Sequence, residues 1–328
     1  MHEADGVDGI QDVEDVEDVE DVEDVEDLGV VERSSSVHGP LGTVVEVHVR
    51  AADPAAVDRA LAAAFAEVDR LEHVFTAFDD DSDLNRWRRG ELDPPPGELA
   101  AVLDLARTWR ARSGGAFDPA AAALVACWSA AAADGRVPTG DELTAARARM
   151  ARTTPDPDDP PPWTLNALAK GVVVDAAVAV ALAVDGVRDV VVNAGGDLRH
   201  HGPEPLVVGI EDPARPHDNA QPLVRVALHD GALATSGGAR RGWTIDGRWH
   251  SHVLDPRSGR PVDHVASASV LAPDAATADV VATVCSVLPP AEGVAFVDDL
   301  DEPDVACLVV EPDGARHRSR GWAVHEVP

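Results

Sequence analysis

The sequence predicts an α+β fold. Segments with strand periodicity and segments with helix periodicity both occur, they do not alternate strictly along the chain, and 45% of the 328 residues are hydrophobic. A core of that size suits one large domain, and no internal repeat divides the chain. We therefore expect a single large domain with mixed sheets and packed helices.

In the first half, one strand precedes several helices. Residues 42–50 alternate apolar and polar side chains, and residues 54–75 place their apolar side chains on one helical face, which core packing explains. Further elements are predicted as helices over residues 98–112, 119–133 and 141–150, and as a rigid polar loop over residues 153–162.

The second half contains most of the strands. Residues 169–184 are almost entirely Ala and Val, which predicts a buried helix, and Asp246-Gly247 predicts a hairpin turn. Strands are predicted over residues 190–193, 206–210, 223–228, 265–271 and 305–310, and helices over 277–288 and 291–300. Gly195-Gly196 predicts a tight turn between the first two of these strands.

Charge distinguishes a tail from the domain. The formal net charge is −32, which disfavours nucleic acid and anionic membranes as partners. Residues 12–26 repeat Asp-Val-Glu five times, with too little apolar content to fold alone. We predict a disordered acidic tail over residues 1–36 and a folded domain over residues 37–328.

Cysteine use and the N-terminus bear on the compartment. The three cysteines, Cys127, Cys285 and Cys307, are far apart and odd in number, which argues against a disulfide framework. Neither a signal peptide, nor a lipid-attachment cysteine, nor a sufficiently long apolar stretch is seen. We expect a cytoplasmic protein without membrane insertion.

One lysine stands out. Lys170 is the only lysine among 27 basic residues. A lysine has a compact, pKa-adjustable ammonium that differs from a guanidinium, so a single lysine retained among arginines indicates a function. The alternative is that this lysine was retained by chance. It lies in the segment LNALAKG at the start of the predicted buried helix, where free N–H groups add to anion binding.

A carboxylate and a hydroxyl share one face of the helix predicted over residues 277–288. Asp279 and Thr283 are four residues apart, so their side chains lie one turn from each other. Such oxygen ligands suit Mg²⁺. The alternative is that Asp279 only caps or solvates the first turn.

Two loops rich in small residues are candidates for ligand contact. The paired glycines of residues 193–197 let the backbone approach a ligand closely. Residues 234–238 add hydroxyl groups beside a strand. Plain hairpin geometry remains the alternative for both loops.

Histidine and aromatic side chains complete the candidate set. His250 and His252 face one side if they lie on a strand, and one of them could act as a general base. Asp118 is expected to be the N-cap of a helix that begins at Pro119, after a glycine-rich loop. Phe78, in an acidic turn, could stack on a ring.

The order of these segments resembles the ApbE family of FAD:protein FMN transferases. In sequence order the chain shows Phe78, SDLN at 82–85, GGAFDP, LNALAKG, NAGGD, VGIEDP, LATSGG, SHVLDPRSG and ATADVVAT. Each segment is weak evidence alone, but their joint order between about residues 75 and 285 is specific.

The resemblance implies a T-fold-related α+β domain with FAD as the donor and Mg²⁺ as the metal ion. It implies metal ligands from Asp279, Thr283 and a main-chain oxygen near Ala167. It also implies a flavin nucleotide pocket lined by Phe78, Gly115, Ala116, Phe117, Asp118, Lys170, Gly195, Gly196, Asp197, Thr235, Ser236, Gly237 and His252.

The chain departs from the family pattern at several positions. Asn166 stands where aspartate is usual, Asp83 where glutamate is commoner, and Ser258 where threonine is usual. Phe78 often corresponds to tyrosine, so a hydroxyl contact is lost but stacking survives. Most relatives are exported lipoproteins, whereas this sequence shows no such signal, so we expect a cytoplasmic acceptor protein.

The expected reaction is the transfer of FMN from FAD to a Thr or Ser hydroxyl of an acceptor protein, with release of AMP. Lys170, together with Mg²⁺ held by Asp279, would bind the pyrophosphate, and His252 would be the base. Two alternatives stay open: a Mg²⁺-dependent FAD pyrophosphatase that uses water as the nucleophile, and a non-catalytic FAD-binding protein.

Overall fold

The computed structural model describes residues 30–215, 220–302 and 304–328. The Asp-Val-Glu repeat lies outside the described residues. The first strand, β1 (Val31–His38), pairs along its whole length with β2 (Val44–Ala51). The predicted boundary between residues 36 and 37 therefore falls inside a strand, and folded structure begins before it.

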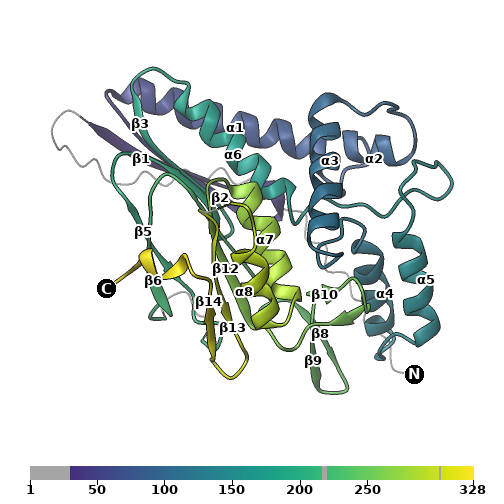
Figure 1. The fold of residues 1–328 in the computed structure, drawn as a ribbon. Coiled ribbons are helices and arrows are strands. Elements are labelled where there is room, and N and C mark those ends of the chain that lie inside the picture. Colours follow the sequence, from purple (N-terminus) through teal and green to yellow (C-terminus); the bar gives the residue numbers. More distant parts are fainter. Residues whose placement is uncertain (1–29, 216–219, 303) are drawn as a thin grey trace, which may run out of the picture.

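An eight-stranded antiparallel sheet forms the centre of the fold (Figure 1). Its strand order is β1-β2-β3-β4-β7-β12-β13-β14, with β3 (Val187–Ala194), β4 (Asp197–His201), β7 (Ala232–Gly237), β12 (Ser267–Ala272), β13 (Ala306–Val310) and β14 (Arg316–Arg318). The α+β class is confirmed, and every described strand pair is antiparallel, so the sheets are not mixed.

Four helices pack over one face of this sheet, and they are α1 (Pro54–Phe75), α6 (Ala169–Leu182), α7 (Ala275–Val287) and α8 (Pro290–Asp298). Their Ala and Val side chains are buried against the strands. The carboxylate of Asp53 accepts a hydrogen bond from the Ala56 N–H at 2.9 Å, and Asp274 accepts one from the Thr277 N–H at 2.7 Å. These caps fix where α1 and α7 begin.

A small sheet covers the other face. It consists of β5 (Leu206–Ile210), β6 (Val224–Leu228) and β15 (Glu326–Val327), in the order β15-β6-β5. Between the two sheets lies a second buried cluster of Leu198, Ile210, Val226, Leu228, Leu233, Leu271, Ala306, Leu308, Val310 and Trp322.

A helical part lies beside the sheet (Figure 1) and contains α2 (Asp83–Arg88), α3 (Gly97–Arg112), α4 (Ala122–Ala133) and α5 (Gly140–Met150). The hairpin of β8 (Gly242–Ile245) and β9 (Arg248–Ser251) joins it to the sheet, because Trp128 of α4 stacks on Trp243 with ring centroids 5.8 Å apart. The turn residues Asp246 and Gly247 have φ of 51° and 73°, as the predicted hairpin requires. The pair β10 (Leu254–Asp255) and β11 (Arg260–Pro261) follows.

The structure corrects several predicted elements. Helix α4 begins at Ala122 rather than Pro119, because Asp118 caps a preceding turn through the Ala120 N–H at 2.9 Å. Helix α2 replaces part of the predicted acidic turn, and its first turn is capped by Ser82. Strands β4 and β7 were not predicted, so Gly195-Gly196 joins β3 to β4 rather than to β5. No helix among the described residues is long and apolar enough to cross a membrane.

Candidate active site

A lysine–carboxylate ion pair lies where α6 meets the sheet. Lys170, the second residue of α6, places Nζ 2.5 Å from Oδ2 of Asp197, the first residue of β4. The preceding Gly195 and Gly196 have φ of 61° and 98°, which glycine adopts without strain and which bring Asp197 back under the helix start. Asp197 is buried, whereas the Lys170 side chain is 26% exposed, so the ammonium can reach a ligand.

Asp279 of α7 lies close to this pair and is almost fully buried. The Gly171 N–H donates a hydrogen bond to its carboxylate, while its Oδ2 has no hydrogen-bond partner among the described residues. Burial, reinforced by the negative charge of Asp197 and opposed by Lys170, raises the pKa of Asp279 to about 8. Burial lowers the pKa of Lys170, but the charges of Asp197 and Asp279 outweigh it, so the net pKa is raised and the lysine remains an ammonium.

The raised pKa makes the stability of the metal-free protein depend on pH. Between about pH 4, near the unfolded pKa of Asp, and about pH 8, the folded state keeps a proton on Asp279 that the unfolded chain has lost. We therefore expect the free energy of unfolding to fall as pH rises through this window, by up to about 1.4 kcal/mol per pH unit. Urea titrations of wild type and Asp279→Asn, both in chelator, measure this. Parallel pH profiles for the two proteins would show that Asp279 is ionised normally.

Helices α6 and α7 approach each other closely at this centre. A Cβ atom on Gly171 would lie 2.3 Å from the Ala275 carbonyl oxygen, so only glycine permits the contact. Asp175, one turn further along α6, accepts hydrogen bonds from the Ala275 and Ala276 N–H groups at 2.8 and 3.0 Å. The start of α7, and with it Asp279, is thereby held in register with Lys170.

Strand β7 supplies the hydroxyl groups predicted to contact a ligand. The Thr235 N–H lies 3.4 Å from Oδ1 of Asp197, which ties β7 to the ion pair. The Ser236 hydroxyl donates to the Ser286 hydroxyl on α7 at 3.1 Å, and Ser286 donates to the carbonyl of Thr283 at 2.8 Å. The predicted residues of β7 and α7 therefore belong to one hydrogen-bonded unit.

His252 lies just beyond the end of β9 and not on it as the sequence suggested. Its Nδ1 is 3.0 Å from the Arg241 carbonyl oxygen, which can only accept, so Nδ1 carries the proton and Nε2 is the free acceptor. Burial, aided by the nearby Arg241 charge, lowers the pKa of His252. The charge of Arg241, which directly precedes β8, also acts on Lys170, so Arg241 lies near both the histidine and the ion pair.

The remaining candidates lie on two loops of the helical part. Phe78 is 89% exposed at the tip of a loop that Asn85 holds through the carbonyls of Ala77 and Asp79, at 3.1 and 2.8 Å. Its ring is therefore presented to solvent and free to stack, and Asn85 is explained by its role in the loop.

The glycine-rich loop before α4 is more constrained. Ala116 and Phe117 are buried in the core, so their side chains are not available to a ligand and only their backbone could serve. Asp118 pairs with Arg110 at 2.9 Å, and with Gly115 it borders a cavity of about 420 Å³. Among the contacts described, none joins this loop or Phe78 directly to Lys170.

The sequence analysis missed three residues that organise the centre: Gly171, Asp175 and Arg241. Gly171 and Asp175 are four residues apart and so share one face of α6, which was the available signal. Arg241 carried no signal, because its contact with His252 depends on how the residue before β8 meets the residue after β9.

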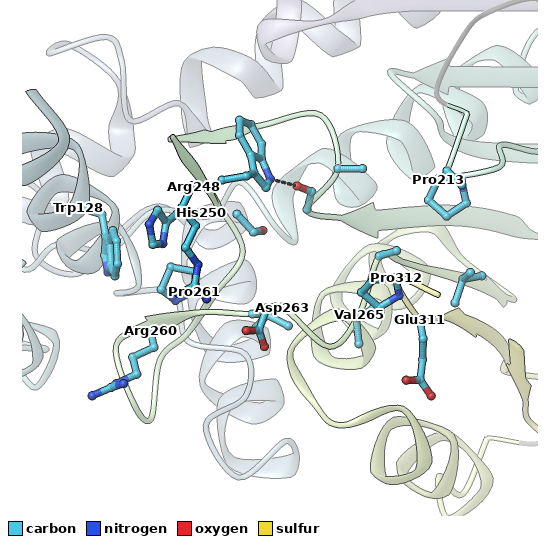
Figure 2. Close-up of a pocket in the computed structure, with 18 of the residues that line it drawn as sticks. Trp128, Pro213, Arg248, His250, Arg260, Pro261, Asp263, Val265, Glu311 and Pro312 are labelled. Carbon is cyan, nitrogen blue, oxygen red and sulfur yellow. Dashed lines mark hydrogen bonds between the residues drawn. The ribbon is translucent and has the colours of Figure 1, made fainter. Parts of the chain in front are cut away.

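A larger cavity, of about 900 Å³, adjoins this centre and does not contain its charged residues (Figure 2). Its lining includes Gly238 and Ser251, which are the neighbours of Gly237 and His252 in the sequence. We place the chemistry at the ion pair rather than in the larger cavity, because buried carboxylates with a lysine are the reactive groups.

The fold and the centre define an α+β protein with a lysine–carboxylate site suited to a phosphate-bearing ligand. The chain belongs to the ApbE family, whose sequence profile matches residues 41–309.

Relatives cover most of the chain. It is 31% identical over 314 residues to the FAD:protein FMN transferase of Treponema pallidum, spanning 86% of this chain and 85% of that protein. It is also 31% identical over 270 residues to the FAD:protein FMN transferase of Vibrio cholerae, spanning 76% and 80%.

Solved structures support the same fold. The crystal structure of the ApbE protein of Thermotoga maritima superposes with a TM-score of 0.73 at 26% identity, covering 90% of this chain and 100% of that one. The flavinyl transferase ApbE of Pseudomonas stutzeri superposes with a TM-score of 0.74 at 22% identity, covering 92% and 100%.

Proposed function

We propose that this chain transfers FMN from FAD to a Ser or Thr hydroxyl of an acceptor protein, forming a phosphoester and releasing AMP. The observation that carries the proposal is the Lys170–Asp197 pair beside Asp279, whose buried Oδ2 has no hydrogen-bond partner among the described residues. Family membership supports the same reaction, since the relatives in Treponema and Vibrio are FAD:protein FMN transferases.

The residues present fit a Mg²⁺ ion. A buried carboxylate oxygen without a donor is costly unless a cation or proton meets it, and Asp279 Oδ2 is such an atom. Thr283, one turn along α7, and the main chain at Ala167, two residues before α6, would add the oxygen ligands that Mg²⁺ prefers. When bound, the ion supplies charge stabilisation to the pyrophosphate.

The chain's own residues would orient FAD. Lys170 would neutralise a phosphate oxygen, and the free N–H groups at the start of α6 would add to that attraction. The Gly195-Gly196 turn and Thr235–Gly237 would line the flavin nucleotide, while Phe78 would stack on a ring. The loop Gly115–Asp118 would contact it through backbone groups.

His252 would accept the proton of the attacking hydroxyl. A new bond forms between the acceptor oxygen and the FMN phosphorus, the pyrophosphate P–O bond breaks, and AMP leaves with that bridging oxygen. The proton moves to Nε2 of His252, which the Arg241 carbonyl keeps free by holding the proton on Nδ1. The lowered pKa keeps this ring neutral, and so basic, at pH 7.

The test is incubation of the protein with FAD and Mg²⁺, with and without an acceptor protein or Thr-bearing peptide, read by mass spectrometry. Transfer predicts an acceptor heavier by FMN less water, with one AMP released for each acceptor labelled. AMP and FMN without an acceptor would indicate the pyrophosphatase, and intact FAD in both tubes would indicate the binding protein. The acceptor's identity and the expected cytoplasmic location stay predictions.

Replacing His252 should slow the chemical step. We expect His252→Ala to lower kcat about 10²–10⁴-fold with a smaller change in KM for FAD, because the general base is lost. The wild-type rate should fall on the acidic side with a midpoint below about 6.5, and this limb should disappear in the variant. His229→Ala, at an exposed position, is the control. An unchanged pH profile in His252→Ala would exclude the assigned role.

A further inference from the structure

The cavity of about 900 Å³ lies directly beside the candidate active site. Gly238, on its wall, follows Gly237, and Ser251, also on its wall, precedes His252. These two segments touch, because a Cβ on Gly238 would lie 2.2 Å from the Ser251 hydroxyl oxygen. Trp249 adds a hydrogen bond from its indole N–H to the Gly238 carbonyl at 3.1 Å, drawn in Figure 2. A chain lying in the cavity would therefore contact Gly238 and Ser251, the neighbours of Gly237 and His252 in the sequence.

The walls of the cavity favour an extended peptide. All four residues of β9 border it, although successive side chains of a strand point to opposite faces, so the cavity follows an edge of the strand. Among the described strands β9 pairs only with β8, which leaves that edge with unpaired main-chain groups. An added segment could pair with them.

The remaining walls are apolar and stiff. Prolines recur along them, at Pro138, Pro213, Pro261 and Pro312. At one end Trp128 packs against His250, with ring centroids 5.3 Å apart (Figure 2). The volume lies near the top of the range of about 300–1,000 Å³ for small-ligand sites, which leaves room for several side chains.

The charges on the cavity walls are unlike those of the whole protein. Two of the lining carboxylates are engaged: Asp212 accepts two bonds from Arg215, at 3.1 and 2.9 Å, and Glu311 lies 2.6 Å from Nε2 of His317. Arg248, Arg260 and Asp263, labelled in Figure 2, make no ion pair with any described residue. Arg316 is a third exposed arginine on the wall, so three arginines face three carboxylates, of which Asp212 is already neutralised by Arg215. The wall is therefore locally positive in a chain of formal charge −32.

We infer that this cavity, here called the acceptor groove, binds an extended acidic segment of the acceptor protein and presents its hydroxyl to His252. The inference rests on the proposed transfer function. The edge of β9 would hold the backbone, the apolar walls would hold alternate side chains, and Arg248 and Arg260 would attract carboxylates. Because the rest of the enzyme is acidic, these arginines would also overcome repulsion between the two proteins.

The test measures binding of two fluorescein-labelled peptides by anisotropy, one with Thr flanked by Asp and Glu and one with Lys at the acidic positions. We expect the acidic peptide to bind at least about tenfold more tightly, with an affinity that falls as salt rises. The variant Arg248→Glu/Arg260→Glu should lose about tenfold or more. Arg59→Glu/Arg188→Glu, which makes the same change at exposed arginines outside the groove, should stay within about twofold.

Equal affinity for both peptides, no binding of either, or the same loss in the control variant would overturn the inference. If the wild-type protein hydrolyses FAD with Mg²⁺ and no peptide, AMP release is measured in parallel for wild type and the groove variant. FAD binding, read from flavin fluorescence, should be unchanged in the groove variant. A wild-type protein that labels no acceptor would count against the proposed transfer, whereas the peptide affinities would still decide whether the groove binds acidic segments.

Discussion

Asp279→Asn is expected to abolish FMN transfer while making the metal-free protein more stable. The substitution keeps the shape of the side chain but removes the charge that the metal requires, so we expect kcat/KM to fall at least about 10³-fold. Above pH 8 the variant should have a larger free energy of unfolding than wild type. At that pH wild type must ionise a buried carboxylate whose pKa is about 8 and whose Oδ2 has no hydrogen-bond partner among the described residues. Opposite changes in activity and stability are typical of residues kept for function.

Three measurements check this prediction. The transfer rate is followed by the mass of the acceptor, stability by urea unfolding in chelator, and metal binding by the rise in Tm when Mg²⁺ is added. The Tm of wild type should rise when Mg²⁺ is added, and the Tm of the variant should not. Glu292→Gln, which neutralises an exposed carboxylate on α8, is the matched control and should leave all three unchanged. A variant that keeps transfer within about threefold of wild type would remove Asp279 from the metal site.

Local signals in the sequence were enough to predict the longer helices, although α2 was missed and the start of α4 was placed too early. Helix α1 has the predicted bounds Pro54–Phe75, because the cap Asp53, the proline at its first position and the apolar periodicity agree. Strand β4 was missed because it is short and its polar residues are buried by distant partners. Asp197 pairs with Lys170, and His200 lies 3.5 Å from Asp189. Such pairs depend on the order of strands in the sheet, which periodicity does not encode.

In the candidate site, too, local signals identified some residues, whereas contacts between distant segments were not predicted. The singular Lys170 and the predicted metal ligand Asp279 are side chains that α6 and α7 bring close together. The ion-pair partner of Lys170 was identified only as part of a glycine loop. Ala116 and Phe117, taken over from the resemblance, are core residues here, because a motif does not reveal whether the side chain or the backbone meets the ligand.

Gly171→Ala should be the most damaging of the mild substitutions. Its Cβ would lie 2.3 Å from the Ala275 carbonyl oxygen and 2.6 Å from the Ala276 Cα, both backbone atoms at the start of α7. Alanine favours the helix by about 1 kcal/mol, but separating two packed helices costs about 3 kcal/mol or more, so the clash dominates. We expect a net loss of at least about 2 kcal/mol, or roughly 4–8 °C in Tm.

Activity should fall with stability in this variant, because the Gly171 N–H that moves away is the donor to Asp279. The measurements are urea unfolding and the rate of FMN transfer at a temperature where both proteins are folded. Gly97→Ala at the start of α3 is the control, since nothing lies within 4 Å of the added methyl group there and the residue is outside the groove. It should be neutral or slightly stabilising. If Gly171→Ala were as stable as Gly97→Ala, α6 and α7 could not be in the contact that brings Lys170 and Asp279 together, and the centre would have to be assembled differently.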